Sequence, residues 1–202
     1  MILALALLIG GVVGGTAAWL AATTTPVTNT FSPSTIGLAL DEAASTFNMI
    51  PGHTMTKDPR ITVTGGSEDC WLFVEVNESD NLDTYIAYAV NTGVATKADG
   101  VTHGGWTQLT GVQGVDNVYY RKVNKSADNQ VFAVLGAGSH PYNESTYSWA
   151  NDQVLTLPGV TVAQMTAAGS SNPTTLAFTA YAVQLKNSNN TEFTPAEAWA
   201  NK

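Results

Sequence analysis

The stretch CWLFVEV, residues 70–76, is apolar at nearly every position, and the stretch LAFTAYAVQL, residues 176–185, follows the same pattern. Both are short and rich in β-branched and aromatic side chains, which is typical of strands that are covered on both faces. We therefore expect these two stretches to be central strands of a β-sheet protein. The edge strands should lie elsewhere in the chain.

Seven further segments show an apolar period of two and are separated by turn residues. They are residues 35–40, 61–64, 84–90, 106–109, 118–123, 131–135 and 153–157. Nine short strands at this spacing are typical of a two-sheet sandwich or a jelly roll. The sequence thus predicts an all-β fold, a jelly-roll-like two-sheet β-sandwich.

Two short helices interrupt the strand pattern, and each has its own capping signal. Thr161 and Gln164 have the spacing of a capping box, with Gly169 placed to stop the helix. Thr194 and Glu197 repeat that spacing around a proline at the first helical position, which predicts a helix over residues 195–200. The polar stretches 92–105 and 136–152 are expected to be long loops.

The first 18 residues have the features of a secretory signal peptide. An apolar run from Ile2 to Val13 is followed by small residues, so we expect cleavage between Ala18 and Trp19. A retained membrane helix is the alternative, although the run is short for a bilayer span and contains glycines. We expect a signal peptide at 1–18, an N-terminal segment at 19–34 and a jelly-roll domain at 35–202, in a secreted protein that has no membrane contact after cleavage.

Charge and cysteine content limit the possible partners. The chain of 202 residues has 16 acidic and 8 basic side chains and no basic cluster, which argues against binding to nucleic acid or anionic lipid. A single cysteine, Cys70, rules out an internal disulfide, and its apolar surroundings predict a buried, inert thiol.

Motifs for catalysis or metal binding are not found in the sequence. His53, His103 and His140 are isolated, and no His-Glu-x-x-His or Gly-x-Ser-x-Gly motif occurs. Acidic pairs such as Asp80 with Asp83 could bind calcium, but solvated turn carboxylates explain them as well. We therefore expect no catalytic residues, no bound metal and no other cofactor.

Aromatic residues gather in the polar stretch HPYNESTYSWAND. Tyr142, Tyr147 and Trp149 could stack on sugar rings, which would make the protein a carbohydrate- or surface-binding module. The alternative is that these rings pack the segment onto the sandwich.

Several segments along almost the whole chain carry a resemblance to one family. They are GGTAAW at 14–19, VTNTF at 27–31, IGL at 36–38, IPG at 50–52, KDP at 57–59, ITV at 61–63, SEDCWLFV at 67–74, VYY at 118–120, LAFTAYAVQ at 176–184 and AEAW at 196–199. On these residues the chain resembles the TasA and camelysin family, which is exported through the SipW-type signal peptidase of Gram-positive bacteria. The resemblance implies a secreted jelly-roll protein that polymerises with itself into fibres of the biofilm matrix, at times with a minor anchoring or nucleating protein.

The resemblance also implies that the mature N-terminal segment completes a sheet of the next subunit. The matching residues of this chain are Thr25, Val27, Thr28, Asn29, Thr30 and Phe31. Most are β-branched or aromatic, as a donated strand requires, and Val27 and Phe31 would point to the same side. Pro26 lacks an amide hydrogen and should lie at the start of the strand or at an edge position.

Two alternatives stay open. Residues 23–31 could instead be a disordered tail or the first strand of their own sheet, because strand chemistry does not depend on which subunit supplies the partner. Camelysin-type relatives are described as metalloproteases, which the lack of a recognisable ligand cluster in this sequence argues against.

Overall fold

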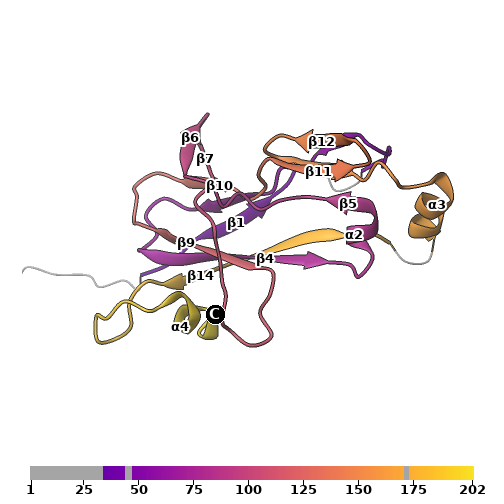
Figure 1. Cartoon of the computed structure of the whole chain (residues 1–202). Helices are drawn as coiled ribbons and strands as arrows, with labels where there is room; N and C mark the ends of the chain where they lie inside the picture. Colours follow the sequence, from indigo (N-terminus) through magenta and orange to yellow (C-terminus); the bar gives the residue numbers. More distant parts are fainter. Residues whose placement is uncertain (1–33, 44–46, 171–172) are drawn as a thin grey trace, which may run out of the picture. The chain divides into compact units, whose positions relative to one another are not determined.

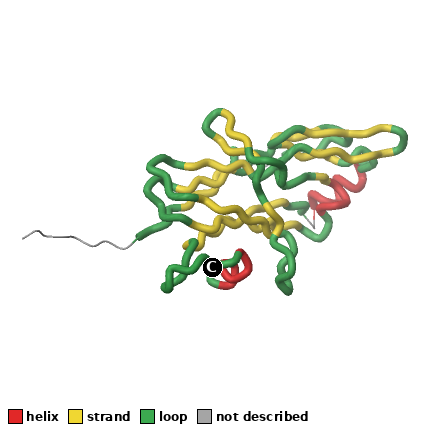
Figure 2. The backbone as a smooth tube through the Cα atoms, turned by 60° about the vertical axis from the view of Figure 1, so that its left-hand side comes forward, coloured by secondary structure: helices red, strands yellow, loops and turns green. Residues whose placement is uncertain are grey.

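The computed structural model describes residues 34–43, 47–170 and 173–202 (Figure 1). The predictions for the signal peptide and the donor strand fall within residues 1–33, outside this part. The described residues form four sheets, and Figure 2 shows that strands dominate while the helices lie at the periphery. The all-β, sandwich-like fold is therefore confirmed.

The two larger sheets contain the strands at the centre of the fold. The five-stranded sheet has the order β1 (Leu38–Asp41), β3 (Arg60–Val63), β10 (Gln130–Ala133), β7 (Val101–His103) and β6 (Thr96–Ala98). The four-stranded sheet has the order β14 (Leu176–Gln184), β4 (Cys70–Glu78), β9 (Val118–Val123) and β8 (Thr107–Gln108). Neighbouring strands in them are antiparallel, apart from the parallel pair β10 and β7.

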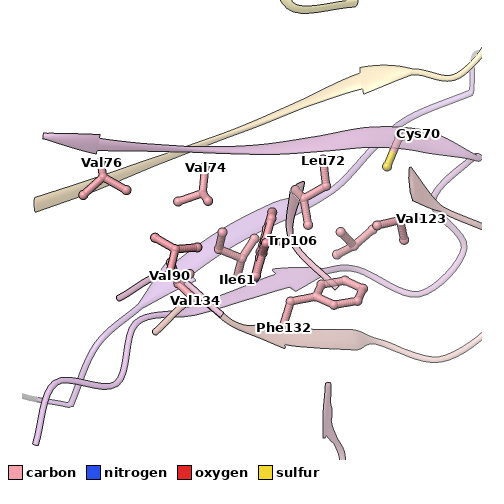
Figure 3. Close-up of a cluster of buried hydrophobic side chains, with 11 residues drawn as sticks. Ile61, Cys70, Leu72, Val74, Val76, Val90, Trp106, Val123, Phe132 and Val134 are labelled. Atoms are coloured by element: carbon pink, nitrogen blue, oxygen red, sulfur yellow. The ribbon is translucent and has the colours of Figure 1, made fainter. Parts of the chain in front are cut away.

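These two sheets share the main hydrophobic core. Figure 3 shows Leu72 and Val74 of β4 pointing toward Ile61 of β3, and all three side chains are fully buried. Trp106 lies in the same cluster and donates its indole hydrogen to the carbonyl of Ala133 at 2.7 Å. Alternate residues of β4 thus face this core, as the period of two requires.

The opposite face of the four-stranded sheet carries an aromatic cluster beneath helix α4 (Pro195–Ala200). Trp199 of this helix contacts Phe73 and Tyr181, with ring centroids 5.3 and 5.4 Å apart. Thr194 and Glu197 form the capping box that the sequence predicts, and the helix has the predicted bounds. Both faces of β4 are therefore covered.

Two smaller sheets and two helices complete the described residues. The first sheet contains β2 (Thr54–Thr56), β13 (Gln153–Thr156) and β5 (Ile86–Ala87), and the second contains β11 (Gly138–Tyr142) and β12 (Ser145–Trp149). Helix α2 (Leu82–Tyr85) packs with β5 and β13 in a second core cluster, and helix α3 (Val162–Ser170) begins at the predicted capping box of Thr161 and Gln164.

Three local predictions from the sequence are wrong. The expected strand over residues 84–90 is a strand only at 86–87, because residues 82–85 form the helix α2, a third short helix. The expected loop at 92–105 holds the hairpin β6–β7, and the expected loop at 136–152 holds the hairpin β11–β12. Polar side chains on exposed strands hide the apolar alternation that the prediction relied on.

The expected central position of residues 176–185 is also wrong. Strand β14 stands at the end of its sheet in the described part of the chain, and only β4 pairs with it. Its apolar character on both faces comes from the core on one side and the cluster beneath α4 on the other. Cover above and below a strand says nothing about its neighbours in the plane of the sheet.

Candidate functional site

Among the described residues, strand β14 pairs with β4 alone, and β1 lies close to β14 without pairing with it. Two hydrogen bonds just beyond the ends of the strand show which of its residues bond to β4. The amide of Ser79 donates to the carbonyl of Thr175, and the amide of Leu185 donates to the carbonyl of Asp69. With the register of β14 on β4, these bonds show that odd-numbered residues of β14 direct their amides and carbonyls toward β4. The even-numbered residues direct theirs to the open side. They are Leu176, Phe178, Ala180, Ala182 and Gln184.

A groove of about 750 Å³ lies beside the first residues of β14. Its walls come from the end of β1, the segment after β1, β2, α2 and the start of β14, and most of the lining side chains are apolar. The apolar lining residues are Leu40, Phe47, Met49, Met55, Pro59, Leu82, Ile86, Val154, Pro173, Leu176, Ala177 and Phe178. A groove of this size with such a lining is large enough for several side chains of a partner.

An ion pair stands on the wall of this otherwise apolar groove. The ammonium of Lys57 lies 2.7 Å from Oε1 of Glu42, and the Lys57 side chain is only 7% exposed. The rings of Phe47 and Phe178 lie 5.1 and 5.4 Å from the same ammonium. Together with Asp41, Thr174 and Thr175, the pair supplies the polar side chains of the groove lining. The hydroxyl of Thr174, also on the lining, is buried without a hydrogen-bond partner.

The chain enters its sheets at the opposite end of β14 from this groove. The carbonyl of Thr35 accepts a hydrogen bond from the amide of Glu68, and the hydroxyl of Ser34 donates to the Glu68 side chain. Glu68 precedes Asp69, which bonds to Leu185 at the far end of β14. Ser34 therefore lies toward the end of β14 that is farther from the groove, and residues 34–40 join it to the groove lining at Leu40 over at most about 20 Å.

The three aromatic residues of the predicted ligand surface lie on one face of the hairpin β11–β12. Trp149 is buried over Gly138 and donates its indole hydrogen to the carbonyl of Gly136 at 3.1 Å. The ring of Tyr147 packs against Gly52, and the ring of Tyr142 packs against Gly159. The structure brings the three together, and this packing supports the interpretation that they hold the hairpin on the fold.

Other polar groups of the described residues stabilise the scaffold. Arg60 donates two hydrogen bonds of 2.7 Å to Asp152, and this contact raises the pKa of the guanidinium. Arg121 lies over the rings of Phe132 and Trp106, and burial lowers its pKa to about 10. Cys70 is buried, and desolvation raises the pKa of its thiol to about 11.

Metal-ligating side chains are scattered through the part of the chain that the structure describes. Residues 34–43, 47–170 and 173–202 hold no group of three or more His, Cys, Asp or Glu side chains that could bind one ion. The same residues include no helix that is long and apolar enough to cross a bilayer.

Sequence reasoning missed the groove and its ion pair. Lys57 and Glu42 are 15 positions apart, and neither lies in a recognisable motif. A lysine inside the apolar pattern around residues 55–63 was the only signal, and by itself it does not identify a groove.

Comparisons with known proteins return no match: no protein-family model, no curated protein and no solved structure is similar to this chain.

Proposed function

We propose that this chain is a secreted structural protein, a protomer of extracellular fibres of the biofilm matrix that assemble by strand donation. One observation carries this proposal. Among the described residues, the nine-residue strand β14 has a paired strand on one side only and borders a mostly apolar groove, in a chain whose N-terminal segment has the composition of a strand. An extended segment from a second copy can add to such an edge and bury side chains in such a groove.

The occupant that we propose is residues 19–31 of a neighbouring copy, with Val27 and Phe31 as the side chains that enter the groove. An exposed, flat and apolar strand edge favours aggregation unless it is covered. Leu176, Phe178, Ala180 and Ala182 of β14 are only half-buried although they pack against the core, and Gln184 is exposed. A donated strand would cover these side chains and satisfy the backbone groups beside them.

We propose that cleavage between Ala18 and Trp19 triggers assembly of the subunits, because a segment attached to a signal peptide cannot pair freely with another copy. The signal peptidase of the SipW type is then the first partner of the chain. We propose that other copies of the chain are the main partner afterwards. Uncleaved protein that polymerises as well as the cleaved chain would contradict the trigger.

Electron microscopy of two purified chains tests the proposal. The chain that begins at Trp19 should form fibres, and the chain that begins at Ser32 should stay monomeric. Monodisperse particles from both chains would overturn the proposal, and fibres from both would show that residues 19–31 are not the determinant.

A further inference from the structure

We propose that the donated strand runs antiparallel to β14 of the acceptor, with Phe31 opposite Leu176, Asn29 opposite Phe178 and Val27 opposite Ala180. This inference rests on the proposed function and adds the acceptor strand, the direction and the register. Three observations lead to it: the two ends of β14, its hydrogen-bond pattern and the lining of the groove.

The direction follows from where the chain leaves its own sheets. Ser34 lies beside the end of its own β14, whereas the groove lies beside the start of β14. If the donated segment of a neighbouring copy enters at the groove end, its Phe31 lies beside the first residues of β14. Its earlier residues then lie beside later residues of β14. Its strand then runs opposite to β14, which is the pairing direction with slightly more favourable hydrogen bonds. Copies would follow one another head to tail, and such a contact extends into a filament when its rotation does not close.

The hydrogen-bond pattern of β14 determines which donor residues face the core. Opposite the even-numbered residues of β14, a donor residue directs both its backbone groups to β14 and its side chain inward. Val27, Asn29 and Phe31 occupy these positions in the proposed register. The backbone nitrogen of Pro26, which carries no hydrogen, then faces away from β14, so no hydrogen bond between the two strands is lost. A shift of one residue would turn Pro26 toward β14 and place threonines in the groove.

The length of the connection sets the register. Only residues 32 and 33 separate Phe31 from Ser34, so the body of the donor copy stops Phe31 from moving deeper than the first residues of β14. Phe31 opposite Leu176 reaches the apolar lining that includes Leu82 and Met49.

In this register Asn29 lies beside the Lys57–Glu42 ion pair, one of the polar points of the groove. Opposite Phe178, its amide faces the wall where the ammonium of Lys57 lies 5.4 Å from the Phe178 ring and 2.7 Å from Glu42. A buried amide needs such partners, because an unpaired polar group costs about 1–3 kcal/mol. Thr28 and Thr30 then lie opposite Thr179 and Ala177, on the face of the sheet that is turned away from the main core.

Cysteine pairs in the chain from Trp19 test the register in assembled fibres. The first pair is Thr28→Cys with Thr179→Cys, and the second is Thr30→Cys with Ala177→Cys. Both are opposite, non-hydrogen-bonded positions, whose Cα atoms are about 4.5 Å apart and within disulfide reach. Mild oxidation should give a ladder of linked subunits on a non-reducing gel, and reduction should abolish it. The buried Cys70 can stay in place.

The control pair Thr24→Cys with Ala177→Cys should give no ladder, because the proposed register separates these positions by about 20 Å. Fibres in which both test pairs stay unlinked, link within one subunit, or link no better than the control overturn the register and leave fibre formation standing. An unmodified chain that forms no fibres overturns both proposals.

Hydrogen exchange on unmodified fibres provides a second test that needs no substitution. Peptides that cover residues 176–184 should exchange at least tenfold more slowly in fibres of the chain from Trp19 than in the monomer from Ser32. Unchanged exchange in β14 together with new protection in β1 would overturn the choice of acceptor strand.

Discussion

Lys57 and Glu42 form an ion pair of 2.7 Å on the wall of the groove beside β14, and Phe178 of that strand packs against the same ammonium. The Glu42 carboxylate is more accessible, with 25% of its side chain exposed against 7% for Lys57. A cation with so little access to water depends on its partner. Removal of one partner should therefore destabilise the fold even before any strand enters the groove.

Substitution of one partner tests this dependence. Glu42→Gln should lower the free energy of unfolding by about 1–3 kcal/mol, because it leaves a buried ammonium with a neutral partner. Urea unfolding measures the change. Glu192→Gln is the matched control, since its pair with Lys122 is about 40% exposed on both sides and should be worth less than about 0.5 kcal/mol. An equal loss of unfolding free energy in the two variants would contradict the claim that burial makes the Lys57–Glu42 pair the more important one.

Substitution of Trp149 distinguishes a structural role of the aromatic residues in the hairpin β11–β12 from a role in ligand binding. Its side chain is 7% exposed, so Trp149→Ala should destabilise the fold by about 3–5 kcal/mol, whereas Tyr142→Ala, at an exposed ring, should cost clearly less. Thermal unfolding checks both variants. Loss of binding to a polysaccharide matrix by Trp149→Ala, with stability unchanged, would instead favour the carbohydrate-binding alternative.

The capping box of α4 should make this helix sensitive to acid. Hydrogen bonds from the amide and hydroxyl of Thr194 lower the pKa of Glu197. Because the pKa is lower in the folded chain, this contribution is complete above the unfolded value of about 4.3 and is lost as the pH falls through the folded pKa. Glu197→Gln should therefore destabilise the fold more at pH 7 than at pH 3. An identical loss at both pH values would contradict the assignment.

Cys70 should be unreactive in the folded chain. It is fully buried in the main core, and desolvation by that core raises its pKa to about 11, so little thiolate is available at pH 8. A thiol reagent should label the unfolded chain at least a hundredfold faster than the native chain at this pH. Labelling of native protein at the unfolded rate would show that the core between the two large sheets opens readily.

Much of the fold could be predicted because buried strands have a clear pattern. The segment 118–123 is a strand with the predicted bounds, and residues 70–76 lie within β4, since apolar residues covered on both faces leave little ambiguity. The helix at 195–200 could be predicted from its capping box and proline. These elements are determined by local sequence.

The groove beside β14 could not be predicted in the same way, because it depends on the arrangement of distant segments. Glu42, Lys57 and Phe178 meet only when β1, β2 and β14 pack together. The edge position of β14 was also hidden, since apolarity records what lies above and below a strand. Whether a strand has a neighbour on each side in the plane of the sheet leaves no mark in this pattern.

Peptide complementation tests most directly whether residues 19–31 bind as a strand beside β14. The chain that begins at Ser32 is mixed with a synthetic peptide of residues 19–31, and binding is followed by calorimetry and thermal unfolding. We predict one peptide per chain, and a gain in stability of about 2.7 kcal/mol at a free peptide concentration of 100 times Kd. A control peptide with Val27→Asp and Phe31→Asp should not bind. Absence of binding by the unmodified peptide, or equal binding by the control, would contradict strand donation into the groove beside β14.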